Sequence, residues 1–110
     1  MARRTTLSEV FQRRLKEARK RAKLSQKELG IRAGMDPFSA SPRMNRYELG
    51  IYEPDLDTIG RLAKVLGVPS AFLVADEDHL ARIILLVSTA TQATRGDIVN
   101  WLEEYLDDTD

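Results

Sequence analysis

A Ser-x-x-Glu capping box and two glycines divide the stretch from Leu24 to Gly50 into short helical segments. In the box Ser25 to Glu28, the serine and glutamate side chains can each satisfy a free backbone amide at a helix start. Gly34 and Gly50 are typical of the position just beyond a helix end. The pattern predicts a helix of about eight residues from Ser25 and a second helix over Ala40 to Leu49, capped by Ser39 and joined to the first by a turn.

Similar signals predict helices in the rest of the chain. Thr6 and Glu9 form another capping box, which predicts a helix that ends near Lys23. Its apolar stripe is Phe11, Leu15, Ala18 and Ala22, against a charged face of Arg13, Arg14, Lys16, Glu17, Lys20 and Arg21. Further helices are expected after Pro54-Asp55 (with Leu56, Ile59, Leu62, Ala63 and Leu66 as its apolar set), after Pro69, after Asp76-Glu77-Asp78 and after Thr94-Arg95-Gly96-Asp97.

The composition agrees with one small helical protein. The 110 residues suffice for one core, and 43% hydrophobic residues with only 6% aromatic ones suit packed helices. The absence of cysteine excludes disulfides, thiolate metal sites and cysteine nucleophiles. No apolar run follows the segment Met1 to Thr6, so we expect neither a signal peptide nor a membrane anchor. The expected location is the cytoplasm.

Charge is divided unevenly along the chain although the formal net charge is zero. Residues 1–50 hold 13 Lys or Arg and 5 Asp or Glu, a balance of +8, whereas residues 51–110 hold 4 and 12, a balance of −8. A basic half attracts a phosphate backbone and an acidic half is repelled by it. The alternative is a chance asymmetry of a solvated surface.

The residues of the basic half resemble a known family. The segments that carry the resemblance are Leu15-Lys16-Glu17-Ala18-Arg19, Leu24-Ser25-Gln26-Lys27-Glu28-Leu29, Ala33-Gly34, Met44-Asn45-Arg46-Tyr47-Glu48-Leu49-Gly50, Pro54, Leu56 and Ala63-Lys64-Val65-Leu66-Gly67-Val68. In this order and spacing they are similar to the Cro and lambda-repressor helix-turn-helix family, also called the xenobiotic-response-element family, over roughly Leu7 to Leu73. The resemblance implies a five-helix lambda-repressor-like DNA-binding domain over residues 1–75. The helix signals beyond it predict a C-terminal two-helix extension over residues 76–110, so the expected fold is all-α.

The resemblance also implies roles for individual residues in binding double-stranded DNA. Arginine suits base reading because its planar guanidinium can donate two hydrogen bonds to one guanine. For Arg43 and Arg46 of the third helix, the alternative to base reading is a solvated or phosphate-contacting face. For Ser25, the alternative to a phosphate contact is a helix cap alone. The implied base-reading residues are Ser41, Pro42, Arg43 and Arg46; the phosphate contacts are Gln26, Asn45 and Ser25; and the structural ion pair joins Arg19 to Glu48, with Met44 and Tyr47 facing the core.

One departure from the family pattern lies in the turn before the third helix. Thirteen residues separate Gly34 from Glu48, about four more than in the common pattern, so the turn is enlarged by residues such as Met35 to Phe38. One hypothesis is a neutral surface insertion. The other is that Pro37 and Phe38 touch DNA or brace the recognition helix.

The C-terminal part carries more apolar surface than one small core needs. Residues 83–87 form a continuous apolar band, which favours a helical hairpin that makes a homodimer, and a two-fold dimer would bind a near-palindromic site. The alternative is a hairpin that only covers its own domain. The expected dimerisation residues are Ile83, Ile84, Val87, Trp101 and Tyr105, the last two with the lesser alternative of an aromatic ligand pocket.

No enzyme motif is present: the chain has no phosphate-cradling glycine loop and no Gly-x-Ser-x-Gly turn. The single histidine, His79, has no companion ligands, so we expect no metal site. We also expect no cofactor, no small-molecule effector and no membrane partner. The favoured hypothesis is a transcriptional regulator, and repression is its expected output. The competing hypotheses are an antitoxin or interaction module whose C-terminal helices bind a protein, and a helical bundle with no DNA role.

Overall fold

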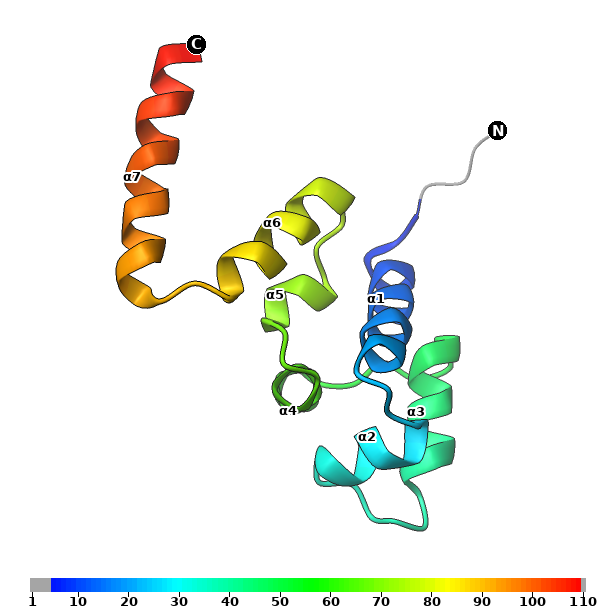
Figure 1. Ribbon diagram of the computed structural model, residues 1–110. Helices are drawn as coiled ribbons and strands as arrows, with labels where there is room; N and C mark the ends of the chain where they lie inside the picture. The colour runs from blue at the N-terminus through cyan, green and yellow to red at the C-terminus, as the bar shows by residue number, and fades with distance from the viewer. Residues whose placement is uncertain (1–4, 110) are drawn as a thin grey trace.

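The computed structural model describes residues 5–109, which fold into seven helices without a strand (Figure 1). The predicted all-α fold is therefore confirmed over this part of the chain. Of the segment Met1 to Thr6, residues 1–4 lie outside the described residues. The helices are α1 (Leu7–Arg21), α2 (Gln26–Arg32), α3 (Ala40–Leu49), α4 (Leu56–Leu66), α5 (Ser70–Leu73), α6 (Asp78–Ser88) and α7 (Gln92–Thr109).

Local side-chain hydrogen bonds explain where several helices begin. The Ser25–Glu28 capping box is complete, with both of its hydrogen bonds at 3.0 Å. Asp55 Oδ1 accepts from the amide of Thr58 at 2.8 Å at the start of α4, and Glu77 accepts two amides at the start of α6. These hydrogen bonds lower the pKa of all three carboxyl groups, because they stabilise the ionised form.

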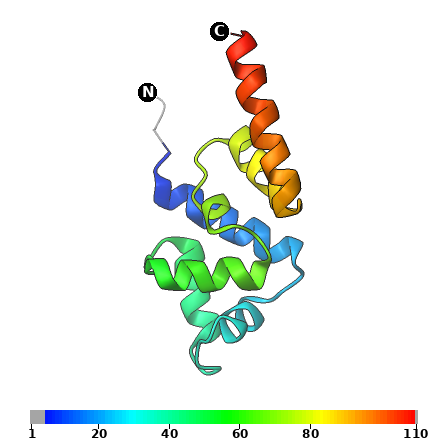
Figure 2. The same ribbon diagram turned by 90° about the vertical axis from the view of Figure 1, so that its left-hand side faces the viewer.

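Five helices share one core. One large side chain from each of α1 to α5 is fully buried, and all five belong to one hydrophobic core. They are Leu15, Leu29, Met44, Leu62 and Leu73. Figure 2 shows the five helices gathered together, with α6 and α7 above them. Because full burial of such a side chain contributes about 1.5–3 kcal/mol, this shared core holds the helices in fixed relative positions.

The structure corrects the predicted faces of α1. Ala22 is exposed beyond the end of the helix, which stops at Arg21, and Lys23 has a left-handed backbone with φ of 60°. Arg14, expected on the charged face, is 4% exposed. Its Nε donates to the carbonyl of Ala75 at 2.7 Å, because the segment between α5 and α6 covers this side of α1.

Two further helix predictions need correction. Leu56, placed in the apolar set of α4, is 84% exposed because it occupies the first residue of the helix, outside the packed face. The last helix begins at Gln92, earlier than expected, where the Thr91 hydroxyl accepts from the amide of Thr94 at 3.2 Å.

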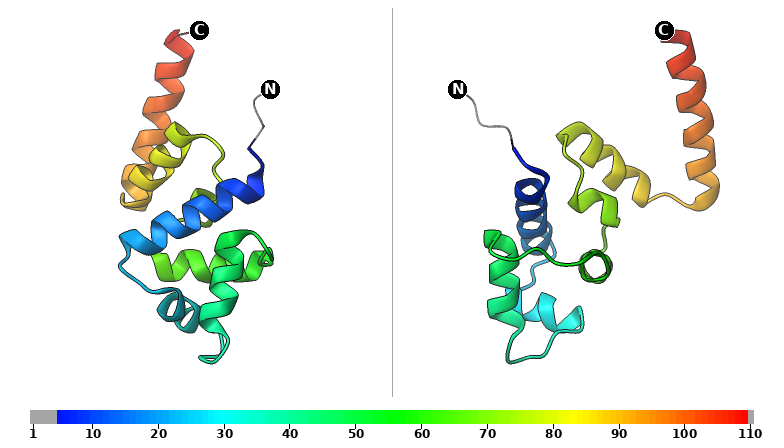
Figure 3. Two further views of the ribbon diagram at one scale, coloured as in Figure 1. Left: turned by 90° about the vertical axis from the view of Figure 1, so that its right-hand side faces the viewer. Right: turned by 180° about the vertical axis from the view of Figure 1, so that it is seen from behind.

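The two C-terminal helices are placed differently. α6 packs on the core through Ala81, which is 2% exposed, with Ile84 and Leu85 beside it. α7 runs away from α6 and from the core, as the views in Figures 1 and 3 agree. The expected division at residue 75 and the role of both helices as one dimerisation unit stay predictions. No helix within residues 5–109 combines the length and apolarity required to cross a membrane.

Candidate nucleic-acid interface

The close packing of α2 against α3 depends on a glycine. A Cβ atom at Gly30 would lie 2.8 Å from the Cβ of Ala40, which is fully buried at the first turn of α3. Met35 is also buried here, and its amide donates to the Gly30 carbonyl at 2.9 Å. The contact fixes α3 across α2, so that the outer face of α3 is held by the core behind it.

Glu48 fixes the other end of α3. Its carboxylate accepts from Arg19 Nε at 2.6 Å and Nη2 at 3.0 Å, and from Gln26 Nε2 at 3.2 Å. The side chains of Arg19 and Glu48 are 13% and 4% exposed. The hydrogen bond to Glu48 raises the pKa of Arg19, and a bidentate pair of this kind also restricts the relative orientation of α1 and α3.

The face of α3 that points away from the core is polar and basic. Arg43 and Arg46 are exposed, as are Pro42 and Asn45, while Ser41 is half-buried. Neither arginine forms an ion pair with a carboxylate of the described residues. On the opposite face Met44 and Tyr47 are buried, which confirms that they face the core.

Aromatic rings support both exposed arginines. Arg43 Nε donates to the Tyr47 hydroxyl at 3.0 Å, with the guanidinium 5.9 Å from the centre of the Tyr47 ring. The Arg46 guanidinium lies 5.8 Å from the centre of the Tyr52 ring. These contacts leave the Nη donors of both guanidinium groups available. They also limit the side-chain conformations, so less conformational entropy is lost when the arginines bind a ligand.

The residues expected to contact phosphate lie together where the start of α2 meets the outer face of α3. Gln26 Nε2 donates to Asn45 Oδ1 at 3.2 Å, which links the first residue of α2 to the outer face of α3. Ser25 caps the same helix, and its hydroxyl accepts from the amide of Glu28. The group therefore combines an amide side chain with a helix N-terminus. Both Nε2 hydrogens of Gln26 are used within the protein, so this side chain would exchange its hydrogen bond to Asn45 for one to a phosphate oxygen, while backbone amides at the helix start can also donate.

The enlarged turn projects outward and does not brace α3. Phe38 is 98% exposed and Pro37 is exposed as well, so neither side chain packs on the helix. Ser39 precedes α3 but does not cap it with its side chain, contrary to the prediction, because its hydroxyl donates to the Asp36 carbonyl at 3.3 Å. The anchors are Met35 and Ala40, whose burial the sequence pattern did not reveal.

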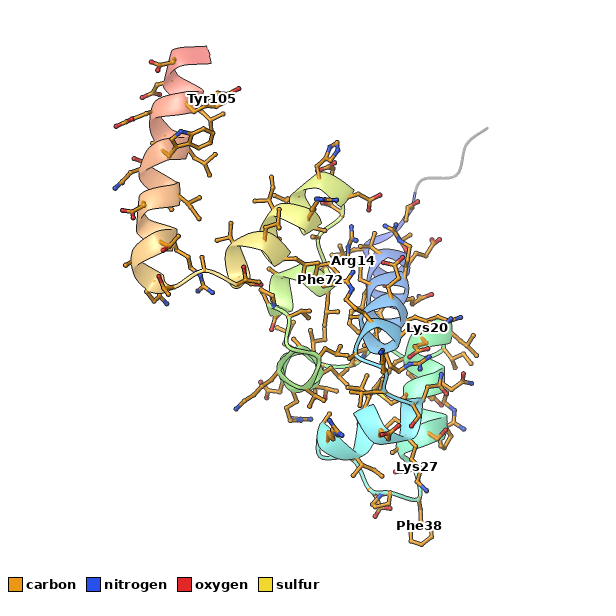
Figure 4. The ribbon with its side chains drawn as sticks, in the orientation of Figure 1. Arg14, Lys20, Lys27, Phe38, Phe72 and Tyr105 are labelled. Carbon is orange, nitrogen blue, oxygen red and sulfur yellow. The ribbon has the colours of Figure 1, made fainter. Side chains whose placement is uncertain are left out.

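The expected dimerisation residues lie on both C-terminal helices and not on one continuous face. Ile83 is 50% exposed on α6, where Ile84 and Val87 are half-buried. On α7, the exposed rings of Trp101 and Tyr105 stack with centroids 5.1 Å apart, and Figure 4 shows Tyr105 far from the core.

The described residues contain no group of three or more side chains placed to hold a metal ion. The His79 imidazole is 93% exposed and lies 3.5 Å from the Glu77 carboxylate at the start of α6.

Comparison with known proteins relates these features to a family. Residues 11–75, more than half of the chain, match the model of the helix-turn-helix domain. The chain is also similar to a solved structure, the crystal structure of transcriptional regulator BswR, with 47% sequence identity and a TM-score of 0.78. That match covers 84% of this chain and 92% of the other. No curated protein matches the chain.

Proposed function

The chain belongs to the helix-turn-helix domain family, and we propose that it is a transcriptional regulator of the Cro and lambda-repressor branch that binds specific double-stranded DNA. In this proposal α3 is the second, recognition helix of the motif and enters the major groove. α2 is the first helix of the motif and crosses the DNA backbone. The likeness to a transcriptional regulator at 47% identity supports the proposal.

The observation that carries the proposal is the outer face of α3. Arg43 and Arg46 stand exposed on a helix that is fixed by the core behind it, and among residues 5–109 neither forms a salt bridge with a carboxylate. An arginine with free donors can bind guanine O6 and N7 together, which distinguishes bases by about 1–3 kcal/mol. Ser41 and Pro42 would lie nearest the start of the helix, where Pro42 can offer only an apolar contact.

Gln26 and Asn45 are proposed to set the depth and orientation of α3 through phosphate contacts, with Ser25 beside them. Their mutual hydrogen bond holds two amide side chains where the start of α2 meets α3. Such contacts bind every sequence equally, because each nucleotide presents the same phosphate. The basic charge of residues 1–50 supports this assignment.

We propose that the protein binds as a homodimer formed through α6 and α7. The support is apolar surface: Trp101 is 60% exposed and Tyr105 52% exposed on a helix that leaves the core. A two-fold dimer would place two copies of α3 one DNA turn apart, about 34 Å, on a near-palindromic site. Repression is the proposed output, since a bound dimer can occlude a promoter, and the proposed location is the cytoplasm, with the nucleoid.

Selection of bound duplexes from a random library tests the proposal. We expect a near-palindromic site and, on that site, a loss of base preference in Arg46→Ala but a uniform loss across sequences in Gln26→Ala. Lys64→Ala, which removes an exposed basic side chain of α4, outside α2, α3 and the proposed dimer helices, is the matched control and should bind normally. Equal changes in Arg46→Ala and Gln26→Ala would contradict the division of roles.

Salt dependence separates this function from that of a bundle without a DNA role. A dimer that makes six to ten phosphate contacts should lose about 10³–10⁵ in affinity between 50 and 200 mM salt. Absence of duplex binding at 50 mM salt would refute the proposal. Co-purification of a different protein in a fixed ratio would instead favour an antitoxin or interaction module.

A further inference from the structure

The tip of the turn between α2 and α3 is built to hold an aromatic ring in solvent. Buried Met35 and Ala40 anchor its two ends against Gly30. Between them, Asp36 Oδ1 accepts from the amide of Phe38 at 2.8 Å, and the Asp36 carbonyl accepts from the amide of Ser39 at 3.0 Å. The result is a short, hydrogen-bonded turn with no apolar cover for the Phe38 ring.

The position of this ring relates it to α3. Phe38 precedes the first residue of α3 by two positions and lies at the same end of the molecule as Lys27, as Figure 4 shows. A ring that projects from the start of a recognition helix extends the reach of that helix along the DNA. A single exposed apolar residue is common on protein surfaces, so exposure alone would not suffice. The anchored turn and its position before α3 supply the additional argument.

We infer that Phe38 reads a thymine by apolar contact with its C5-methyl group in the major groove, beside the base pairs that face α3. This inference rests on the proposed function. The thymine methyl is the apolar group that a base pair presents in that groove, and an aromatic side chain is a suitable partner for it. A phosphate is a poor alternative partner, because the ring offers it no donor and the Asp36 carboxylate, which accepts from the Phe38 amide, would repel it.

Replacement of thymine by deoxyuridine tests the contact, since deoxyuridine lacks only the C5-methyl group. The probe is a duplex selected from a random library, in which each thymine is replaced in turn. We expect one position in each half-site at which the replacement weakens wild-type binding about threefold to tenfold, which is the contribution of roughly one buried methyl group. The variant Phe38→Ala should show the same loss on the thymine duplex and no further loss on the deoxyuridine duplex.

The controls separate this contact from folding and from the proposed function. Phe38→Ala should unfold at the wild-type temperature, because the ring is 98% exposed. Phe38→Leu, which keeps an apolar side chain, should retain part of the thymine preference. Normal binding by Phe38→Ala would overturn the inference, and so would a loss of affinity that no deoxyuridine position reproduces. In either case, a loss of base preference in Arg46→Ala would still uphold the proposed function. A chain that bound no duplex would overturn both.

Discussion

Replacement of Glu48 by leucine is expected to destabilise the protein by about 3 kcal/mol, because it leaves the Arg19 guanidinium buried without its carboxylate. Loss of one partner of a buried pair costs about 3–5 kcal/mol. The Arg19 side chain is only 13% exposed, so water replaces the lost hydrogen bonds poorly. The lower end of the range applies because Arg19 Nη1 would still donate a hydrogen bond to the Leu24 carbonyl, at 3.0 Å in the wild type. For a domain of this size the midpoint of thermal unfolding should fall by about 12 °C.

A double-mutant cycle distinguishes this buried pair from a surface pair. Arg19→Met leaves Glu48 buried with Gln26 as its remaining side-chain partner, so it should cost at least as much as Glu48→Leu. The double variant Arg19→Met/Glu48→Leu should lose less than either single variant, because it removes both charges and fills the space with apolar atoms. Urea unfolding with an unchanged m value measures all three. Additive losses, or a loss below about 1 kcal/mol in Glu48→Leu, would refute the reasoning.

Three further predictions concern packing, capping and association. Gly30→Ala should cost about 1–3 kcal/mol in urea unfolding, because the new Cβ would lie 2.8 Å from that of Ala40; a neutral result would show that α2 and α3 separate easily. Asp55→Ala should lower stability at pH 7 whereas Asp55→Asn should not, since asparagine also caps helices. Hydrogen bonds from Thr58 lower the pKa of Asp55 in the folded protein. The stabilisation that ionised Asp55 provides is therefore complete above its ordinary pKa of about 3.9 and is lost as pH falls through the lowered pKa of the folded state. Thermal unfolding between pH 7 and pH 2 should therefore show a larger acid loss in the wild type than in Asp55→Asn, and equal losses would argue against the cap. Trp101→Ala combined with Tyr105→Ala should convert a dimer to a monomer in sedimentation at low micromolar concentration, and an unchanged dimer would exclude α7 from the interface.

Local signals were sufficient to predict most of the fold. The bounds of α3, from Ala40 to Leu49, are those expected from the sequence, and the Ser25–Glu28 box starts α2 as expected. Capping depends on residues three positions apart, and glycine at a helix end depends on one backbone conformation, so both can be read without tertiary information. Gly50, with φ of 76°, is such a position.

Several of the errors concern residues whose surroundings come from distant parts of the chain. Arg14 sits on an otherwise charged helix face, and only the path of the chain around Ala75 explains its burial. Leu56 matches the apolar spacing of α4 but has no neighbour to cover it. The outward direction of Phe38 depends on Met35 and Ala40 being the anchors of the turn. Sequence spacing identifies the candidate interface, and tertiary packing determines which of its residues are exposed.

The placement of two arginines on α1 connects the candidate interface to the C-terminal helices. Arg14 and Arg19 are five residues apart, which places them about 140° apart around the helix, so they face different neighbours. Arg19 binds Glu48 of α3, whereas Arg14 Nη2 binds Asp78 of α6 at 3.1 Å and stacks over the Phe72 ring. In the proposed dimer, the position of α6 sets the position of the partner, and α1 relates α6 to α3 through these two contacts. Asp78→Asn should therefore change the preferred half-site spacing or weaken binding to the palindrome, while binding to an isolated half-site stays as in the wild type. Equal weakening on both duplexes would show that α1 does not transmit the geometry.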